Sequence, residues 1–146
     1  MKNPRVLEFL GLDLQTWPWL KPDTCLLVWD PDHTGSITSG RQLFGNATFQ
    51  LVFRDGFEAL RLLDDNGDGF LTGEELRGLA GWRDADSNGV SAVSEVMPVG
   101  RAGIVSIAVN AGLKEDLLHP LNPAGLTLRD GSTRPVWDWF ASPLPK

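Results

Sequence analysis

The stretch DDNGDGFLTGEE, residues 64–75, decides how this chain is interpreted, because acidic residues and glycines alternate in it. An apolar pair and two glutamates follow the alternating part. A solvated turn, a pair of catalytic carboxylates and a cage of oxygen ligands for a metal ion can all have this composition. The catalytic alternative is the weakest of the three, because no nucleophile or histidine accompanies the carboxylates as a partner. We therefore expect no enzymatic activity.

The spacing of residues 64–75, called the second loop below, matches the loop that binds calcium through about six to eight oxygen atoms. In such a loop the side chains at the first, third, fifth and ninth positions, the carbonyl oxygen at the seventh and a bidentate glutamate at the twelfth face one ion. Gly69 stands at the sixth position, where the chain must turn sharply. The pattern predicts a calcium site with the ligands Asp64, Asn66, Asp68, Phe70, Thr72 and Glu75.

Residues 84–95, the third loop, repeat this spacing with two departures. The eighth position, which is apolar in most such loops, is Ser91. The ninth position is Ala92, so water must complete the coordination at that point. The pattern still predicts a calcium site, with the ligands Asp84, Asp86, Asn88, Val90 and Glu95.

Residues 30–41, the first loop, are a weaker copy of the same pattern. The twelfth residue is Arg41, a cation where the bidentate acid is required, and Gln42 follows it. The candidate ligands of this degenerate site are Asp30, Asp32, Thr34, Ser36 and Thr38. Two calcium ions are therefore expected as cofactors, and whether the first loop holds a third is left open.

The segments around the second loop predict a helix on each side of it. Residues 55–63 and 74–82 carry apolar side chains at helical spacing. The segment between the second and third loops, Leu76 to Arg83, has room for a single helix that both loops must share. The first and second loops have apolar residues at the eighth position, Ile37 and Leu71, and are expected to pair through them.

Short strands are predicted at residues 25–29 and 104–109, and on both sides of an Asp-Gly turn at residues 130–131. The predicted fold class is α+β, with a helix–loop–helix centre of three loops and a small antiparallel sheet or hairpin at the C-terminal end. We expect one domain over residues 1–146, formed by a cover segment (1–24), the loops (25–97) and a β-rich tail (98–146).

Charge and composition exclude several classes of partner. The net charge of −6 and the pI of about 4.8 argue against nucleic acid and against an anionic membrane surface, since both attract basic patches. No transmembrane span, Sec signal peptide or zinc-ligand spacing is seen in the sequence. A protein partner of unspecified kind is left open.

Five stretches, from about residue 17 to 140, carry a resemblance to a known family. They are LLVWDPDHTGSITSGRQLFGN, DGFEALRLLDDNGDGFLTGEE, GWRDADSNGVSAVSEV, GIVSIAV and LRDGSTRPVWDWF. They resemble a bacterial EF-hand module, the EF-hand repeat domain of large secreted RTX-type (hemolysin-type) calcium-binding proteins. The resemblance implies an extracellular module without enzymatic activity, and a cytoplasmic location is the alternative. This chain has Gln42 where that family usually has an acid.

The function that these observations favour is a structural module folded or stabilised by calcium. The alternative is a sensor or adaptor that binds a protein partner once calcium is bound. Grooves of that kind favour methionine, and this chain has two methionines. The sequence therefore favours the structural module over the sensor.

Overall fold

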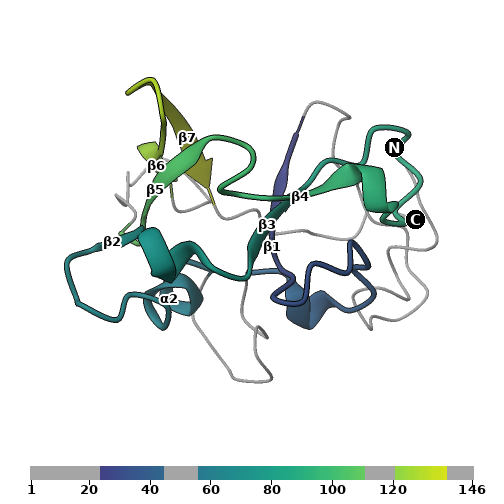
Figure 1. The fold of residues 1–146 in the computed structure, drawn as a ribbon, viewed down its shortest axis with the longest axis horizontal. Coiled ribbons are helices and arrows are strands. Elements are labelled where there is room, and N and C mark those ends of the chain that lie inside the picture. The colour runs from purple at the N-terminus through teal and green to yellow at the C-terminus, as the bar shows by residue number, and fades with distance from the viewer. Residues whose placement is uncertain (1–23, 45–55, 111–120, 138–146) are drawn as a thin grey trace, which may run out of the picture.

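The computed structural model describes residues 24–44, 56–110 and 121–137, in which strands predominate (Figure 1). The strands are β1 (Leu26–Trp29), β2 (Phe70–Thr72), β3 (Leu79–Trp82), β4 (Val96–Pro98), β5 (Ile104–Ala108), β6 (Leu121–Leu128) and β7 (Thr133–Trp137). The described residues contain one α-helix, α2 (Gly56–Arg61), and the 3-10 turns η1 (Gly40–Gln42), η3 (Gly73–Leu76) and η4 (Val93–Glu95). Nearly all of the predicted cover segment, residues 1–24, lies outside the described residues.

The first sheet has the strand order β1-β3-β4, and all of its pairs are antiparallel. Leu26 lies opposite Trp82 and Val28 opposite Ala80, so β3 is the central strand. The whole third loop is the connection between β3 and β4. The sheet therefore holds both ends of that loop in neighbouring strands.

The second sheet has the order β2-β5-β6-β7 and is also antiparallel. Its edge strand β2 is part of the second loop, and Leu71 in β2 lies opposite Ile107 in β5. The hairpin expected around Asp130-Gly131 is present, because β6 and β7 pair on both sides of it. The second loop is thus fixed to a sheet built mainly from the C-terminal part of the chain.

Two groups of buried apolar side chains fill the space around the sheets. The larger group joins α2 to the second sheet and is made of Phe57, Leu60, Leu71, Leu76, Leu79, Val99, Ile107 and Val109. The smaller group lies on the first sheet and is made of Val28, Ile37, Ala80 and Trp82. Each group contains the eighth residue of one loop, Ile37 or Leu71, so loop conformation and core packing depend on each other.

The predicted helix–loop–helix centre is wrong. The helix predicted before the second loop is present in part, as α2, but the helix predicted over residues 74–82 is not. Those residues form η3 and then β3. Gly78 has a φ of +88°, which an α-helix does not allow, and the buried run after it suits the central strand of a sheet. The described fold is β-rich, with two antiparallel sheets and one short helix, and not an α+β fold with an EF-hand-type centre.

Gly78 gives a first test of this fold. A Cβ atom there would lie 2.8 Å from Cζ3 of Trp29, so alanine would add a steric clash to an unfavourable φ. Gly78→Ala should lower the free energy of unfolding by about 2–4 kcal/mol in urea denaturation. Gly131, at φ +85° with no atom within 4 Å of such a Cβ, is the matched control, because its substitution adds the φ strain without the clash. An equal effect of the two substitutions would contradict the packing of Trp29 against Gly78.

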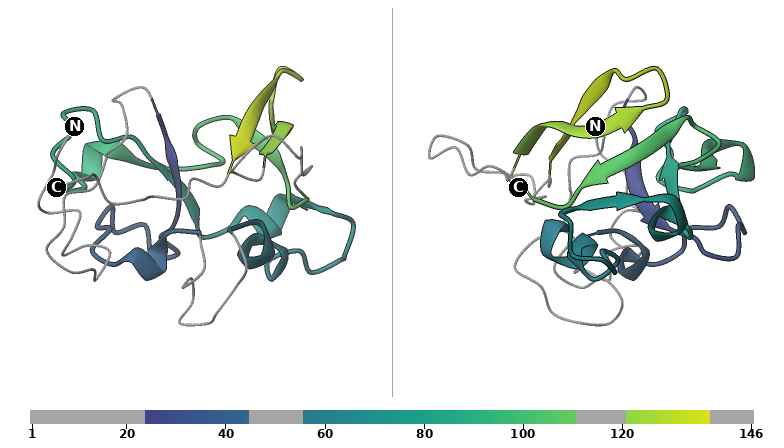
Figure 2. Two further views of the ribbon diagram at one scale, coloured as in Figure 1. Left: turned by 180° about the vertical axis from the view of Figure 1, so that it is seen from behind. Right: turned by 60° about the vertical axis from the view of Figure 1, so that its left-hand side comes forward.

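The second and third loops lie at opposite ends of the long axis of the molecule (Figures 1 and 2). The second loop follows α2 at one end, and the third loop joins β3 to β4 at the other. Any ligands that the two loops bind would therefore be held far apart.

Among the described residues no helix is long and apolar enough to cross a membrane.

Candidate metal centres in two acidic loops

The second loop brings three carboxylates together. One oxygen each of Asp64, Asp68 and Glu75 lies within 4.8 Å of the other two. Asp64 follows the end of α2, and Glu75 lies in η3, directly after β2. Because β2 is paired with β5, the strand between the last two carboxylates has a fixed position in the sheet.

Backbone hydrogen bonds hold each of these carboxylates in place. The amide of Gly69 donates to Oδ2 of Asp64 at 2.9 Å, and the amide of Phe70 donates to Oδ1 of Asp68 at 2.9 Å. The amide of Thr72 donates to Oε2 of Glu75 at 3.0 Å. Charge-assisted bonds of this kind are stronger than neutral ones. The loop backbone therefore arranges the carboxylates around one centre.

One oxygen of Asp64 has no partner within the described residues. Its Oδ2 accepts the bond from Gly69, but its Oδ1 is buried and makes no hydrogen bond. A buried acceptor without a partner costs about 1–3 kcal/mol. A bound cation would supply the missing partner, so this atom is the strongest indication of a ligand in the loop.

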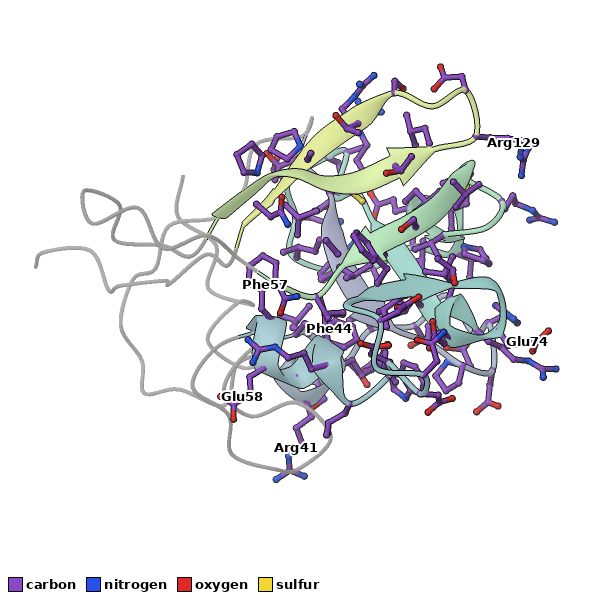
Figure 3. The ribbon with its side chains drawn as sticks, turned by 90° about the vertical axis from the view of Figure 1, so that its left-hand side faces the viewer. Arg41, Phe44, Phe57, Glu58, Glu74 and Arg129 are labelled. Atoms are coloured by element: carbon purple, nitrogen blue, oxygen red, sulfur yellow. The ribbon has the colours of Figure 1, made fainter. Side chains whose placement is uncertain are left out.

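The two neighbouring glutamates at the end of the second loop have different positions. Glu75 is half-buried, and its carboxylate lies together with those of Asp64 and Asp68. Glu74 extends outward into solvent (Figure 3), where its carboxylate lies 3.5 Å from the guanidinium of Arg77. Such an exposed ion pair contributes little to stability. Glu74 is therefore a natural control for experiments on Glu75.

The third loop forms a second group of the same kind. One oxygen each of Asp84, Asp86 and Glu95 lies within 4.8 Å of the other two. Asp84 is buried, and its Oδ2 accepts a hydrogen bond from the amide of Gly89 at 2.7 Å. The amide of Ala92 donates to Oε2 of Glu95 at 3.1 Å, which repeats the bond between Thr72 and Glu75. The two loops therefore share one internal hydrogen-bond pattern.

The surroundings of Asp86 in the third loop hold its pKa above the ordinary value. Reduced hydration is the largest cause, and a hydrogen bond with Asp84 and the negative charges of Glu95 and Asp84 add to it. A raised pKa means that the surroundings disfavour the ionised form. A divalent cation among the three carboxylates would reverse this effect.

Trp82 connects the third loop to the core. Its side chain is fully buried, and its indole Nε1–H donates to Oε2 of Glu95 at 3.5 Å. The sequence pattern did not indicate this contact, because the two residues lie in different segments. Glu95 is consequently placed next to a fluorescent side chain, which makes the site accessible to spectroscopy.

Two of the other predicted ligands, Asn66 and Asn88, make side-chain hydrogen bonds within their loops. Asn66 accepts a bond from the amide of Asp68 at 3.1 Å. Asn88 donates through its side-chain amide to Asp86 at 2.9 Å and accepts from the amide of Val90 at 2.8 Å. The side chains of Phe70 and Val90 are exposed and apolar, so each of these residues can offer a cation its carbonyl oxygen but no side-chain ligand.

The first loop differs from the other two. Within the described residues, no group of three carboxylate, histidine or cysteine ligands forms there. Asp30 is buried, whereas Asp32 and Thr34 are exposed. Burial tends to raise the pKa of Asp30, but hydrogen bonds from the amide of Gly35 and from the hydroxyl and amide of Thr34 hold that pKa below its ordinary value. The Asp30 carboxylate is thus stabilised in its ionised form by the loop itself.

The predicted pairing of the first and second loops through Ile37 and Leu71 is wrong. The amide of Ile37 donates to Oγ of Ser91 in the third loop at 2.8 Å, while Leu71 pairs with Ile107. The hydroxyl of Ser91 is therefore the acceptor that joins the first loop to the third. A serine at the usually apolar eighth position marked residue 91 as unusual in the sequence, but the pattern did not show that Ile37 is its partner.

Together, these features describe a small β-rich module that holds two groups of carboxylates in loops at opposite ends. The family model of the SPM domain matches residues 11–140 of this chain. The chain belongs to the SPM domain family.

A curated protein also matches part of the chain. Over 94 residues the chain is 32% identical to the iron-regulated protein FrpA of Neisseria meningitidis serogroup C. The match covers 61% of this chain and 8% of that protein. The chain therefore corresponds to a small part of this much longer relative.

The resemblance to the EF-hand repeat module of RTX-type proteins is corrected by these findings. The matching family is the SPM domain, and the described loops are flanked mainly by strands and 3-10 turns. The carboxylate spacing that suggested the resemblance is real, but it belongs to loops in a β-rich fold. The extracellular location implied by that resemblance stays a prediction.

Proposed function

We propose that the chain is a calcium-binding structural module, with one ion in the second loop and one in the third. The unpartnered oxygen of Asp64 is the observation that carries this proposal. Oxygen atoms, those of carboxylates among them, are the ligands that calcium prefers, and each loop brings three carboxylates together. Neither loop offers the nitrogen or sulfur ligands that favour zinc or copper.

Electrostatic repulsion within each group supports a stabilising role for the ion. Two carboxylates about 5 Å apart repel each other by about 1–3 kcal/mol at effective dielectric constants between those of water and the protein surface. Each loop holds three such groups. A divalent cation between the carboxylates attracts all three, so the stability of the folded loops should rise with the logarithm of the free calcium concentration once that concentration exceeds the dissociation constant.

The positions of the loops indicate what the ions would hold together. The second loop contains β2, whose Leu71 contributes to the larger core, and it leads through η3 toward β3. The third loop connects β3 to β4. Calcium at both sites would therefore fix the connections into and out of the central strand of the first sheet.

A calcium sensor is the second candidate. It is favoured by three exposed apolar side chains in or next to the third loop, those of Val90, Val93 and Met97. A sensor should expose additional apolar surface when calcium binds, whereas a structural module should not. The fluorescence of an apolar dye, measured with calcium and with EDTA, separates the two. A calcium-dependent increase in dye binding would favour the sensor over the module.

Terbium luminescence tests the proposed site in the third loop. Terbium is a hard cation that substitutes for calcium at oxygen ligands, and it emits when a nearby tryptophan is excited. Because Trp82 contacts Glu95, we expect tryptophan-sensitised emission that millimolar calcium displaces. Glu95→Gln should weaken terbium binding by at least about tenfold, since a half-buried charge partner contributes more than about 1.4 kcal/mol, so emission at a sub-saturating terbium concentration should fall strongly.

The matched control for Glu95 is its neighbour Ser94, which is exposed. Ser94→Ala should leave the emission and its displacement by calcium unchanged. Absence of sensitised emission in the unsubstituted protein, or equal emission from the Glu95→Gln variant, would contradict a cation site in the third loop.

A further inference from the structure

The side chain of Gln42 closes the first loop from within. Its Oε1 accepts hydrogen bonds from the amides of Thr38 at 2.9 Å and Ser39 at 3.3 Å. Its Nε2 donates to the carbonyl oxygens of Ser36 and Trp29, both at 3.3 Å. One neutral side chain thus satisfies two donors and one acceptor of the loop backbone, together with the carbonyl at the end of β1.

This position corresponds to that of the closing glutamates in the other two loops. The ninth residue of each loop donates its amide hydrogen to the closing side chain. Thr72 donates to Glu75 at 3.0 Å, Ala92 to Glu95 at 3.1 Å, and Thr38 to Gln42 at 2.9 Å. Gln42 is therefore the spatial equivalent of the two glutamates, although it lies one residue later in the pattern.

Arg41, the residue at the formal twelfth position, takes no part in closing the loop. Its side chain points out of the molecule (Figure 3) and is exposed. The carbonyl of Ser36 stands at the seventh position, where a calcium loop offers its backbone ligand. In the first loop the amide of Gln42 occupies this carbonyl with a hydrogen bond instead.

The acid at the start of the first loop is also satisfied by the protein. Both oxygens of Asp30 accept hydrogen bonds, Oδ1 from Thr34 at 2.9 and 3.0 Å and Oδ2 from the amide of Gly35 at 2.9 Å. Oδ1 of Asp64, the matching residue of the second loop, has no such partner. The first acid of the first loop therefore lacks the unpartnered oxygen that the second loop has, and in this it is like Asp84 of the third loop, whose two oxygens also accept amide hydrogen bonds.

The closed first loop lies directly against the third. The amide of Ile37 donates to Ser91 Oγ at 2.8 Å. Gly35 also approaches Val93 closely, since a Cβ atom on Gly35 would lie 3.0 Å from the Cα atom of Val93. Val93 is the first residue of η4, the turn that carries Glu95. A rigid first loop thus supports the segment that holds a proposed calcium ligand.

We propose that Gln42 closes the first loop in place of a cation, and that this metal-free loop orders the third loop for its ion. The second half of the proposal rests on the proposed function of the third loop, and the first half does not. The amide of Gln42 supplies donors where an ion would supply positive charge, so the first loop is formed whether or not calcium is present.

The first half is tested by Gln42→Glu and Gln42→Ala. A carboxylate in place of the amide loses both donors and leaves an acceptor facing the carbonyls of Trp29 and Ser36, so Gln42→Glu should melt at a lower temperature in EDTA. In calcium it should bind one ion more than the unsubstituted protein, measured by isothermal titration calorimetry. Gln42→Ala should also melt lower in EDTA, but its ion count should not rise. An unchanged count for Gln42→Glu would overturn the proposal.

Amide hydrogen exchange provides a readout on the unsubstituted protein, which needs no variant to fold. In EDTA the amide of Thr38 should be protected, because Gln42 accepts its hydrogen without any ion. Rapid exchange of Thr38 in EDTA that becomes slow in calcium would overturn the proposal. This readout remains decisive even if neither of the other loops binds calcium, so it separates failure of the proposal from failure of the proposed function.

The second half is tested by Ser91→Ala, which removes the acceptor for Ile37. Loss of one hydrogen bond should weaken calcium at the third loop by about 3- to 10-fold. The affinity of the second loop, at the opposite end of the molecule, should be unchanged. An equal effect on both sites, or none on the third, would contradict the support of the third loop by the first.

Discussion

Replacement of Glu75 by glutamine is expected to remove most of the stabilisation that calcium gives through the second loop. Glutamine can accept the hydrogen bond from Thr72 but not also the one from Asn66, and it removes the repulsion from Asp64 and Asp68. These two changes oppose each other, so the melting temperature in EDTA should change little. Glutamine offers one neutral oxygen instead of a bidentate carboxylate, so the calcium affinity should fall strongly. At a calcium concentration 100 times the dissociation constant, a site adds about 2.7 kcal/mol to the free energy of unfolding.

Thermal melting in calcium and in EDTA measures this contribution. For a domain of this size, about 2.7 kcal/mol corresponds to a shift of about 10 °C in melting temperature. Glu74→Gln is the matched control, because Glu74 is adjacent in sequence but extends into solvent (Figure 3). If both variants reduced the calcium-dependent shift equally, net charge and not coordination by Glu75 would explain it.

The second large effect is expected for Leu71, at the eighth position of the second loop. Its side chain is fully buried among residues from α2, β3 and β5. Leu71→Ala should lower the free energy of unfolding by about 2–5 kcal/mol, since a cavity would remain in the larger core. The same substitution should weaken calcium at this loop, because β2 carries the strand between Asp68 and Glu75.

Chemical denaturation and a calcium titration of Leu71→Ala check both effects. Leu62→Ala is the matched control, because Leu62 lies directly after α2, just before the second loop, and its side chain is 54% exposed. The Leu62→Ala substitution should change the free energy of unfolding by no more than about 0.5 kcal/mol. A destabilised Leu71→Ala variant with unaltered calcium affinity would show that the loop keeps its shape without the core.

The carboxylate groups could be predicted from the sequence because their geometry is local. The turn at Gly69 and the short spacing from Asp64 to Asp68 bring these side chains together whatever lies around the loop. The same holds for the turn at Gly89 in the third loop. Local spacing therefore identified both groups, although the elements around them were assigned incorrectly.

The flanking elements could not be predicted in this way. Leu76 and Leu79 have helical spacing, but Leu79 to Trp82 is a short apolar run that is equally consistent with a buried strand. Its neighbours in the first sheet, β1 and β4, decide between the two, and they come from distant parts of the chain. Gly78 at the start of the run was the local signal against a helix.

The contacts between loops were also beyond the local pattern. An apolar eighth position suggested that Ile37 and Leu71 pair, yet each contributes to a different core group. The role of Gln42 depends on a side chain that reaches four backbone groups, which spacing alone does not indicate. Degenerate loops of this kind need the three-dimensional arrangement before their closing residue can be identified.

The most direct test of the central claim is anomalous scattering from crystals of the protein soaked in terbium chloride. Two peaks are predicted in the anomalous difference map. One should lie among Asp64, Asp68 and Glu75, and the other among Asp84, Asp86 and Glu95. No peak is expected in the first loop. A map with no peak at one or both of these carboxylate groups would contradict the account, and so would a map whose strongest peak lies beside Gln42.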